Sequence, residues 1–91
     1  MNNKFPLVSV LMSTFNSEKT LERAIDSILN QSYKNIEFLI CNDGSTDNTK
    51  KILEKYSNLH TQIEITNNAK NVGLTKSLNL LIDKSKGDFI A

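Results

Sequence analysis

Val8-Ser-Val-Leu-Met12 and Phe38-Leu-Ile-Cys41 are the two stretches of sequence that decide the fold. Each is a short, mainly apolar run that leads directly into polar residues: Ser13-Thr-Phe-Asn16 after the first, and Asn42-Asp-Gly-Ser-Thr-Asp47 after the second. Buried parallel strands read as nearly continuous apolar runs, and an open α/β sheet binds its ligand at the carboxyl ends of its strands. The two stretches therefore predict two parallel strands whose carboxyl ends form a binding edge.

Similar runs recur at nearly even intervals along the chain. Strand-like segments begin near Leu7, Ile36, Ile63 and Asp88, at spacings of 29, 27 and 25 residues, close to the roughly 30 residues of a βαβ unit. This alternation predicts a Rossmann-like α/β fold with a parallel sheet, right-handed crossovers and helices on both faces. We expect the strand order 3-2-1-4, which places the binding crevice between the first and fourth strands.

The segments between the strands have the spacing of amphipathic helices. Apolar residues fall on one face of each expected helix: Leu21, Ala24, Ile25, Ile28 and Leu29 in the first, Ile52, Leu53 and Tyr56 in the second, and Leu74, Leu78, Leu81 and Ile82 in the third. Capping groups flank these helices. N-cap oxygens are expected from Asn16, Ser17 and Thr20 before the first helix and from Ser45, Thr46 and Asp47 before the second, and Lys86-Gly87 is expected to close the third.

The composition disfavours several classes of protein. With 91 residues, 38% hydrophobic and 23% charged, the chain is one small globular domain or a part of one. A formal charge of +1 disfavours nucleic acid as a partner, because no global field would hold a polyanion. No apolar run is long enough to span a bilayer, and no signal segment precedes the first strand, so we expect a cytoplasmic protein.

Cys41 and His60 are the only cysteine and the only histidine in the sequence, which excludes an internal disulfide and a zinc-ligand set. We interpret Cys41 as a core residue and His60 as a loop residue.

The expected crevice is lined by the residues after the first strand, by Asp43 and by whatever follows Ala91. Neither G-x-G-x-x-G nor G-x-x-x-x-G-K-[ST] is present, which disfavours dinucleotide dehydrogenases and P-loop enzymes. A carboxylate accepts hydrogen bonds only, so Asp43 suits the N–H groups of a base or the hydroxyls of a ribose, and Phe15 could stack on a base. These residue types predict a nucleoside pocket formed by Ser13, Thr14, Phe15, Asn16 and Asp43.

Each candidate also has a purely structural interpretation. Asp43 could close an Asx turn within Asn-Asp-Gly-Ser, Ser13 and Thr14 could be capping groups, and Phe15 could belong to the core. Asp47 is better explained as a negative charge in the first turn of the second helix. A ligand site and these structural roles are therefore both open for the first four residues.

Five segments together resemble one known family. They are Pro6-Leu-Val-Ser-Val-Leu-Met-Ser-Thr-Phe-Asn16; Leu21 with Ala24-Ile-x-Ser-Ile-Leu-x-Gln-Ser-Tyr33; Ile36-Glu-x-x-Ile-Cys-Asn-Asp-Gly-Ser-Thr-Asp47; Asn71-x-Gly-Leu-Thr-x-Ser-Leu-Asn79; and Lys86-Gly-Asp-Phe-Ile90. In this order, and over nearly the whole chain, they are similar to the amino-terminal half of family 2 glycosyltransferases of the GT-A fold. The resemblance implies that residues 1–91 are the nucleotide-binding part of a truncated GT-A domain.

The resemblance implies site roles and an activity. In that family the position of Asp43 contacts the uracil or ribose of a nucleotide-sugar, and the loop at Ser13, Thr14 and Phe15 lies under the base. Arginine is common in the family where Leu78 stands, so Lys76 is the candidate substitute for a phosphate contact. The implied reaction, in polysaccharide biosynthesis, transfers a sugar with inversion from a nucleoside diphosphate, UDP being favoured, to a saccharide or lipid acceptor.

The resemblance also implies what residues 1–91 lack. The family's Asp-x-Asp metal motif begins a few residues beyond the position of Ala91, and its catalytic base and acceptor site lie farther on. We therefore expect no catalytic residue and no metal ligand within this chain, and Mg²⁺ or Mn²⁺ only in a full-length parent, which would work in the cytoplasm or at the cytoplasmic face of a membrane. The fragment itself is expected to be inactive, and to self-associate through its exposed edge strands.

Two other classes of protein fit the pattern less well. A noncatalytic nucleotide-binding or receiver-like interaction module would use Asp43 as an acidic strand-end group, but it would also need an acidic cluster and a lysine after a later strand. A nucleotidyltransferase would have a Gly-rich, basic loop after the first strand, and residues 13–17 contain neither glycine nor a basic residue. The interaction module is kept as the alternative to the glycosyltransferase.

Overall fold

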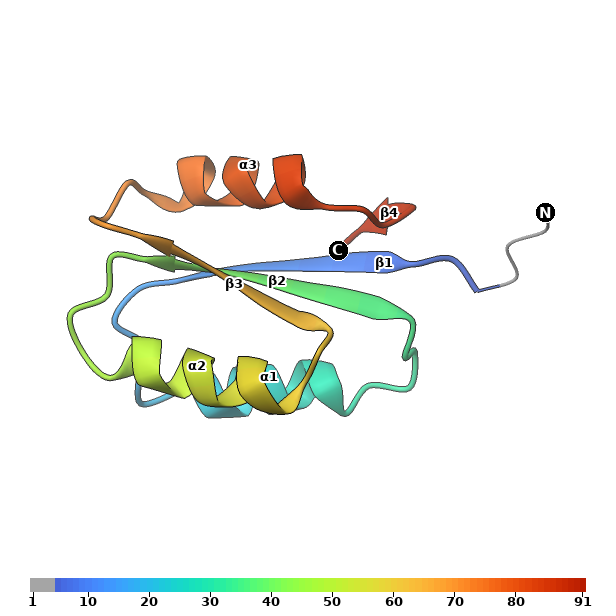
Figure 1. Ribbon diagram of the computed structural model, residues 1–91, viewed down its shortest axis with the longest axis horizontal. Helices are drawn as coiled ribbons and strands as arrows, with labels where there is room; N and C mark the ends of the chain where they lie inside the picture. Colours follow the sequence, from blue (N-terminus) through green and yellow to red (C-terminus); the bar gives the residue numbers. More distant parts are fainter. Residues whose placement is uncertain (1–4) are drawn as a thin grey trace.

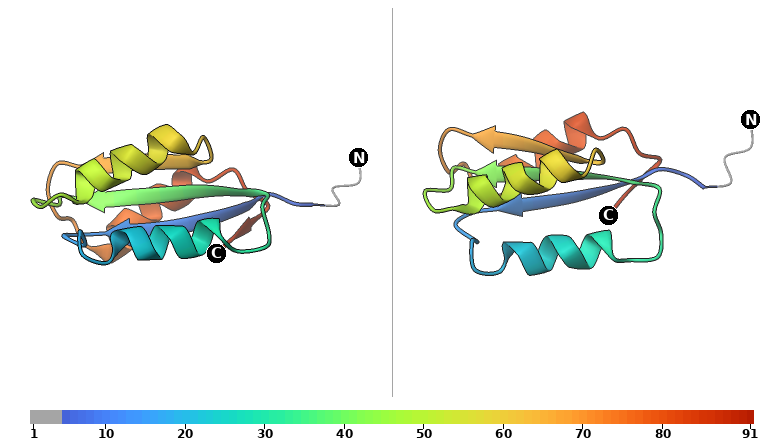
Figure 2. Two further views of the ribbon diagram at one scale, coloured as in Figure 1. Left: turned by 90° about the horizontal axis from the view of Figure 1, so that it is seen from below. Right: turned by 60° about the horizontal axis from the view of Figure 1, so that its bottom comes forward.

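The structure, a computed structural model, describes residues 5–91. One central sheet is covered by α1 and α2 on one face and by α3 on the other, as Figure 1 and Figure 2 show. The elements follow one another as β1 (Val8–Thr14), α1 (Leu21–Leu29), β2 (Ile36–Asp43), α2 (Thr49–Leu59), β3 (Ile63–Asn68), α3 (Leu74–Lys84) and β4 (Phe89–Ile90). The predicted alternation of strands and helices is confirmed.

The four strands are parallel and lie in the order β3-β2-β1-β4, as predicted. β1 pairs with β2 along its whole length, up to Thr14 opposite Asn42. β2 pairs with β3 up to Asp43 opposite Asn68. The carboxyl ends of these three strands therefore meet at one edge of the sheet, on the left in Figure 1.

Each face of the sheet has its own apolar cluster, because alternate strand residues point to opposite faces. The larger cluster lies between the sheet and helices α1 and α2, and its buried members are Val10, Leu21, Ile25, Ile36, Phe38, Ile40, Leu53, Tyr56 and Ile63. The smaller cluster lies on the α3 side and contains Leu39, Cys41 and Leu81. Cys41 is fully buried with a free thiol, which confirms its interpretation as a core residue.

The predicted buried face of α3 is wrong at two of its four positions. Leu74 is 63% exposed and Ile82 45% exposed, whereas Leu81 is fully buried together with Ser77. The physical reason is that α3 lies alone on its face of the described sheet (Figure 1). Its buried row is formed by Ser77 and Leu81, one helical turn apart, and the partly buried Leu78 packs against the smaller cluster.

The capping prediction for α1 is confirmed in position but not in its hydrogen bond, and that for α3 is wrong. The N-cap of α1 is Thr20, whose side chain makes no capping hydrogen bond. The amides of Thr20 and Leu21 donate instead to the backbone carbonyl of Ser17, at 3.0 and 2.9 Å. Helix α3 ends at Lys84 and its C-cap, Ser85, is extended, so Lys86-Gly87 lies beyond the cap and does not close the helix.

β4 forms an outer edge of the described sheet. Its two residues, Phe89 and Ile90, are 62% and 52% exposed. Self-association through this edge stays a prediction.

Within residues 5–91, no helix has both the length and the apolar character needed to cross a bilayer.

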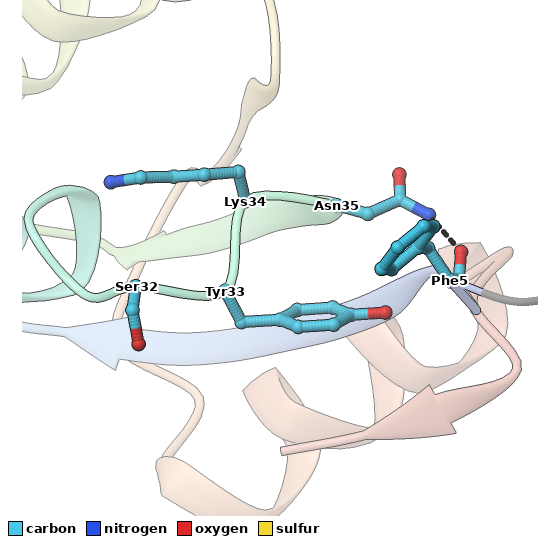
Figure 3. Close-up of a pocket in the computed structure, with 5 residues that line it drawn as sticks. All are labelled: Phe5, Ser32, Tyr33, Lys34 and Asn35. Carbon is cyan, nitrogen blue, oxygen red and sulfur yellow. Dashed lines mark hydrogen bonds between the residues drawn. The ribbon is translucent and has the colours of Figure 1, made fainter.

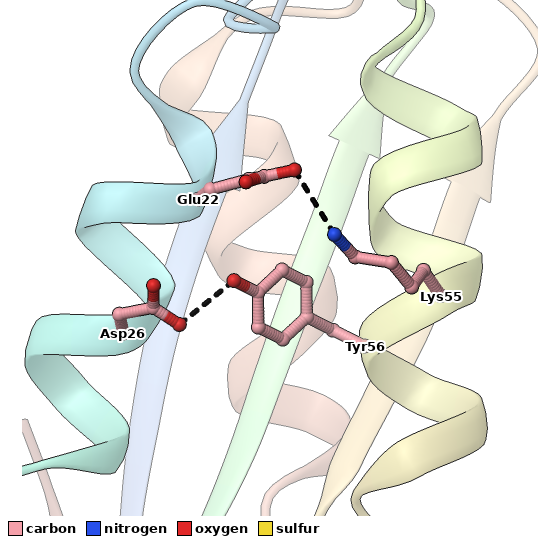
Figure 4. A network of polar contacts seen from close by, with 4 residues as sticks. All are labelled: Glu22, Asp26, Lys55 and Tyr56. Atoms are coloured by element: carbon pink, nitrogen blue, oxygen red, sulfur yellow. Dashed lines mark hydrogen bonds and ion pairs between the residues drawn. The ribbon is translucent and has the colours of Figure 1, made fainter.

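Helices α1 and α2 are joined by two polar contacts beside the larger cluster (Figure 4). The phenol of Tyr56 donates a hydrogen bond to Asp26 at 2.7 Å, and the ammonium of Lys55 pairs with Glu22 at 3.0 Å. The hydrogen bond to Asp26, together with burial, raises the pKa of Tyr56 to about 12. The Lys55–Glu22 pair is half exposed on both sides, so it adds little to stability.

We expect the Tyr56–Asp26 hydrogen bond to make stability fall at alkaline pH. The pKa of the phenol is higher in the folded chain than its ordinary value of 10.0, so its stabilisation is complete below that value and is lost as the pH rises toward about 12. Urea unfolding of the wild type and of Tyr56→Phe across this range measures the effect. The variant should lose about 1 kcal/mol at neutral pH and should decline less at high pH; parallel curves for the two proteins would contradict the prediction.

Candidate functional site

The carboxyl edge of the sheet brings together five of the six site residues predicted from the sequence. Four of them end β1 or follow it directly: Ser13, Thr14, Phe15 and Asn16. Asp43 is the last residue of the neighbouring strand, β2. The sixth, Lys76, lies on an exposed position in the first turn of α3.

Asp43 is buried, and its carboxylate is held by groups that lie at the end of β3 and in the loop that follows. Oδ1 accepts hydrogen bonds from the Val72 amide at 2.8 Å and from the Asn68 side chain at 2.9 Å, and Oδ2 accepts one from the Gly73 amide at 2.9 Å. These hydrogen bonds, that of Val72 foremost, outweigh burial and keep the pKa of Asp43 below its ordinary value. An ionised acceptor therefore stands at the end of β2 and fastens the loop between β3 and α3.

The turn after β2 is closed by a different residue, Asn42. Its Oδ1 accepts a hydrogen bond from the Ser45 amide at 3.2 Å, and its Nδ2 donates to Asn67 at 3.0 Å. The Asx-turn interpretation of Asp43 is therefore wrong. Sequence reasoning missed the supporting asparagines, Asn42, Asn67 and Asn68; the available signal was the Asn67-Asn68 pair at the end of the strand predicted to lie beside Asp43.

Gly44 allows this turn to pack directly against the loop between β3 and α3. Its φ is +75°, and a Cβ at this position would lie 2.5 Å from the backbone carbon of Lys70 and from the backbone nitrogen of Asn71. Backbone atoms cannot move aside as the end of a flexible side chain can. The close approach therefore requires glycine.

Phe15 is 46% exposed, so its interpretation as a core residue is wrong and its ring is open to stacking. Thr14 is buried and Ser13 half-buried. Both belong to β1 itself, and neither caps α1, whose N-cap is Thr20. Contacts of Ser13 and Thr14 with a ligand stay predictions.

Hydrogen bonds tie the loop after β1 to the loop after β2. Asn16, with a positive φ of 48°, donates its amide to the Ser45 hydroxyl at 2.9 Å and accepts the Thr46 amide at its Oδ1 at 2.8 Å. One residue later, the Ser17 amide donates to the Thr49 hydroxyl at 2.9 Å. Asn16 thus has a structural role, and a ligand contact by its side chain stays a prediction.

Asp47 has the structural role favoured from the sequence. Its carboxylate accepts hydrogen bonds from the Thr49 amide at 2.9 Å and the Glu18 amide at 3.3 Å. Hydrogen bonds, that of the Thr49 side chain foremost, keep the pKa of Asp47 below its ordinary value. It therefore satisfies a free amide in the first turn of α2, although the N-cap position itself is Asn48.

Helix α3 directs a serine, not a cation, into the contacts around Asp43. Ser77 is fully buried, and its hydroxyl oxygen accepts a hydrogen bond from the Asn68 side chain at 3.3 Å. Leu78 packs against the smaller apolar cluster. The exposed position of Lys76 leaves its phosphate contact a prediction.

Two hollows of similar volume lie at opposite edges of the sheet. The one at the carboxyl edge holds about 380 Å³ and is lined by Asn42, Gly44, Ser45, Thr46, Lys50, Asn67, Asn68 and Ala69. The other, about 410 Å³, lies at the amino ends of β1 and β2, lined by Phe5, Ser32, Tyr33, Lys34 and Asn35, with the Asn35 amide donating to the Phe5 carbonyl (Figure 3). Only the first borders the strand-end groups described above.

The groups gathered at the carboxyl edge of the sheet are suited to recognising a polar organic ligand. They comprise an ionised acceptor, several amides and hydroxyls, and an open aromatic ring, which together match the donors and flat face of a nucleoside. In the part of the chain that the structure describes, no three His, Cys, Asp or Glu side chains come together in a way that could hold a metal ion. The acceptor, amide and hydroxyl groups named above therefore offer partners to an organic polar ligand.

Comparison with known proteins leads to one family. The profile described as "Glycosyl transferase family 2" matches residues 9–91. EpsE of Bacillus subtilis strain 168, provisionally named a glycosyltransferase, is 43% identical over 90 residues, which are 98% of this chain and 32% of EpsE. The chain thus spans about a third of the length of this relative.

Solved structures share the fold. TarS 1–349 of S. aureus, in complex with UDP-GlcNAc, is 30% identical with a TM-score of 0.83, over 91% of this chain and 24% of that one. The mannosyltransferase PcManGT of Pyrobaculum calidifontis, in complex with GDP-Man and Mn²⁺, has a TM-score of 0.86 at 22% identity, over 93% of this chain and 26% of that one. Because the family profile matches nearly the whole sequence and the sheet has the GT-A order, the chain belongs to glycosyl transferase family 2.

Proposed function

We propose that the chain binds the nucleoside diphosphate sugar, UDP-linked, of a glycosyltransferase that passes the sugar with inversion to a saccharide or lipid acceptor. The observation that carries the proposal is the buried, ionised carboxylate of Asp43 at the carboxyl edge, in the same rim as the exposed ring of Phe15. A relative of 30% identity, TarS, has been solved with UDP-GlcNAc and with UDP, which supports uracil as the base.

The hydrogen bonds of Asp43 leave room for a ligand. Oδ1 already accepts two hydrogen bonds, whereas Oδ2 accepts one, from Gly73. A carboxylate oxygen has two lone pairs, so Oδ2 can accept a second hydrogen bond from the N3–H of uracil or from a ribose hydroxyl. Phe15 would stack on the base, Ser13, Thr14 and Asn16 would form its floor, and Lys76 would face the diphosphate.

The transfer step needs groups beyond those described. A divalent Mg²⁺ or Mn²⁺ neutralises a leaving diphosphate when bound, and PcManGT was solved with Mn²⁺. The carboxylates of residues 5–91 do not gather into a site that fits such an ion. The proposal therefore places the metal ligands and the acceptor's general base outside these residues, and the 91-residue chain is proposed to bind the donor without transferring its sugar.

Calorimetric titration with UDP and CDP tests the proposal with a matched pair of ligands. The two nucleotides share the ribose and the diphosphate, but N3 of cytosine has no hydrogen, so CDP would turn a lone pair toward the Asp43 carboxylate. We expect UDP to bind roughly tenfold or more tightly than CDP, with no UDP released from a UDP-sugar. Equal affinities for UDP and CDP would contradict the proposed contact between Asp43 and uracil. An absence of UDP binding would overturn the proposed function.

A further inference from the structure

A carboxylate lies within the sheet at the end opposite the donor site. Glu37 is the second residue of β2, between the buried apolar residues Ile36 and Phe38, and its register partner on β1 is the fully buried Ser9. A charged group in such a position is costly unless it is hydrogen bonded. The proposed donor site does not use this pair, so its partners elsewhere in the chain are informative.

The partners come from the turn between α3 and β4. One carboxylate oxygen of Glu37, Oε2, accepts hydrogen bonds from the Ser9 hydroxyl and, at 2.6 Å, from the Lys86 amide. The Ser9 hydroxyl in turn accepts one from the Gly87 amide at 2.9 Å. We call this set the Glu37 clamp: the side chains of Ser9 and Glu37 with the backbone amides of Lys86 and Gly87.

Gly87 shows how closely this turn approaches β1. A Cβ at residue 87 would lie 2.7 Å from the Ser9 amide nitrogen and 2.9 Å from the Leu7 carbonyl oxygen, and it would also collide with the Ser9 hydroxyl. Side-chain carbons essentially never come so near to backbone atoms. The absence of a side chain at residue 87 therefore lets the clamp close.

The clamp stands immediately before a short strand whose side chains bury little apolar surface. β4 pairs with β1 through Phe89 opposite Val8 and Ile90 opposite Ser9, and both of its side chains are more than half exposed. Its backbone contacts include the Ala91 amide donating to the Ser9 carbonyl at 2.8 Å. Since apolar burial contributes little, polar contacts have to fix the register, and in a strand a slip of one residue reverses every side chain.

We infer that Ser9 and Glu37 are positioning residues, which set the register of β4 on β1 from the end of the sheet opposite the donor site. β4 runs parallel to β1, toward the edge formed by Ser13 and Thr14. Any residues that continue this strand would reach that edge in a register decided by the clamp. This last consequence rests on the proposed function; the clamp itself does not.

The ionisation of Glu37 agrees with this role. Burial alone would raise its pKa, but the hydrogen bonds from Ser9, Lys86 and Gly87 and the positive charge of Lys86 outweigh burial and lower the pKa below the ordinary value of 4.5. Asp88, the other acidic group at this turn, accepts a hydrogen bond from the Leu7 amide at 3.1 Å. The clamp is therefore closed at neutral pH and should open as acid protonates Glu37.

Amide hydrogen exchange of the 91-residue chain tests the inference. The Leu11 amide of β1 donates to the Ala91 carbonyl at 3.0 Å, so its protection reports on β4, whereas the Phe38 amide donates to Gln62 and reports on the rest of the sheet. In Glu37→Gln, protection of Leu11 should fall roughly tenfold while Phe38 keeps its protection. Glu64→Gln, which removes the same charge from an exposed position on β3, should change neither amide.

A second variant and a pH series cover the case in which Glu37→Gln unfolds the sheet. Ser9→Ala keeps the carboxylate and should also lower the protection of Leu11. In the wild type, the Lys86 amide proton should shift with a midpoint below pH 4.5, and this transition should be missing from Glu37→Gln. If Leu11 keeps its full protection in Ser9→Ala and through the acid transition of the wild type, the inference is overturned.

The same samples separate this inference from the proposed function. The residues proposed to contact UDP lie at the other end of the strands, so Glu37→Gln should bind UDP with wild-type affinity. A wild-type chain that fails to bind UDP would overturn the proposed function and leave the exchange result intact. A loss of UDP affinity in Glu37→Gln with unchanged Leu11 protection would contradict the assignment of the clamp to β4.

Discussion

Asp43→Ala should weaken UDP binding by roughly tenfold or more and, in the same step, release the loop between β3 and α3. Both effects have one cause, because the carboxylate that would accept the ligand's hydrogen also accepts the amides of Val72 and Gly73. Without it, those two amides lose their acceptor. Calorimetry measures the affinity, and hydrogen exchange at Val72 and Gly73 measures the loop.

Asp83→Ala is the matched control for this variant. It removes the same charge from an exposed position on α3, so it should change neither the affinity nor the exchange. Unchanged UDP affinity in Asp43→Ala, with faster exchange at Val72, would show that Asp43 only anchors the loop. Unchanged exchange would contradict the hydrogen bonds described for the carboxylate.

Gly44→Ala should lower the free energy of unfolding by about 2 kcal/mol or more, a larger loss of stability than that expected for Asp43→Ala. The added methyl group would have to accept a φ of +75° and would meet backbone atoms of Lys70 and Asn71 at 2.5 Å. Since the backbone cannot yield locally, the whole loop has to move, and UDP affinity should fall with it. Urea unfolding and calorimetry of the same sample measure the two effects.

Gly73→Ala separates the two causes of this loss of stability, which are the positive φ and the close approach of the added Cβ to backbone atoms. Gly73 also has a positive φ, +98°, but a Cβ there would have no neighbour within 4 Å. This variant should therefore show only the cost of placing a side chain on this backbone conformation (φ 98°, ψ 159°), about 1–3 kcal/mol. Equal losses in the two variants would mean that the close approach at Gly44 contributes nothing.

The alternation of parallel strands and helices could be predicted because the relevant signals are local. The apolar runs from Val8 and from Phe38, and their even spacing with the later runs, need no knowledge of tertiary contacts. The buried face of α3 could not be predicted in the same way. Periodicity marks Leu74 and Ile82 as apolar positions, but it does not say how many neighbours cover the helix, and here no second helix lies beside α3 on its face of the described sheet.

In the candidate site, too, some features could be predicted from the sequence and others could not. The position of Asp43 at the end of a strand followed from the sequence, whereas its partners are largely backbone amides some thirty residues away, and backbone amides leave no mark in a sequence. Asn16 illustrates the converse problem. A polar side chain after a strand reads the same whether it meets a ligand or, as here, a neighbouring loop. The role of Glu37 could not be predicted from the sequence either, because its partner at Lys86 is a backbone amide.

The position of β1 inside the sheet has a consequence for biosynthesis. β1 is synthesised before β2 and β4, yet it needs β2 on one side and β4 on the other, and the contact between Leu7 and Asp88 closes a loop of 81 residues. Until β4 has been synthesised, one side of β1 therefore presents unpaired amides and carbonyls. A nascent chain stalled before Asp88 should be the species that chaperones hold and that aggregates, whereas a chain that extends through β4 has covered that side of β1.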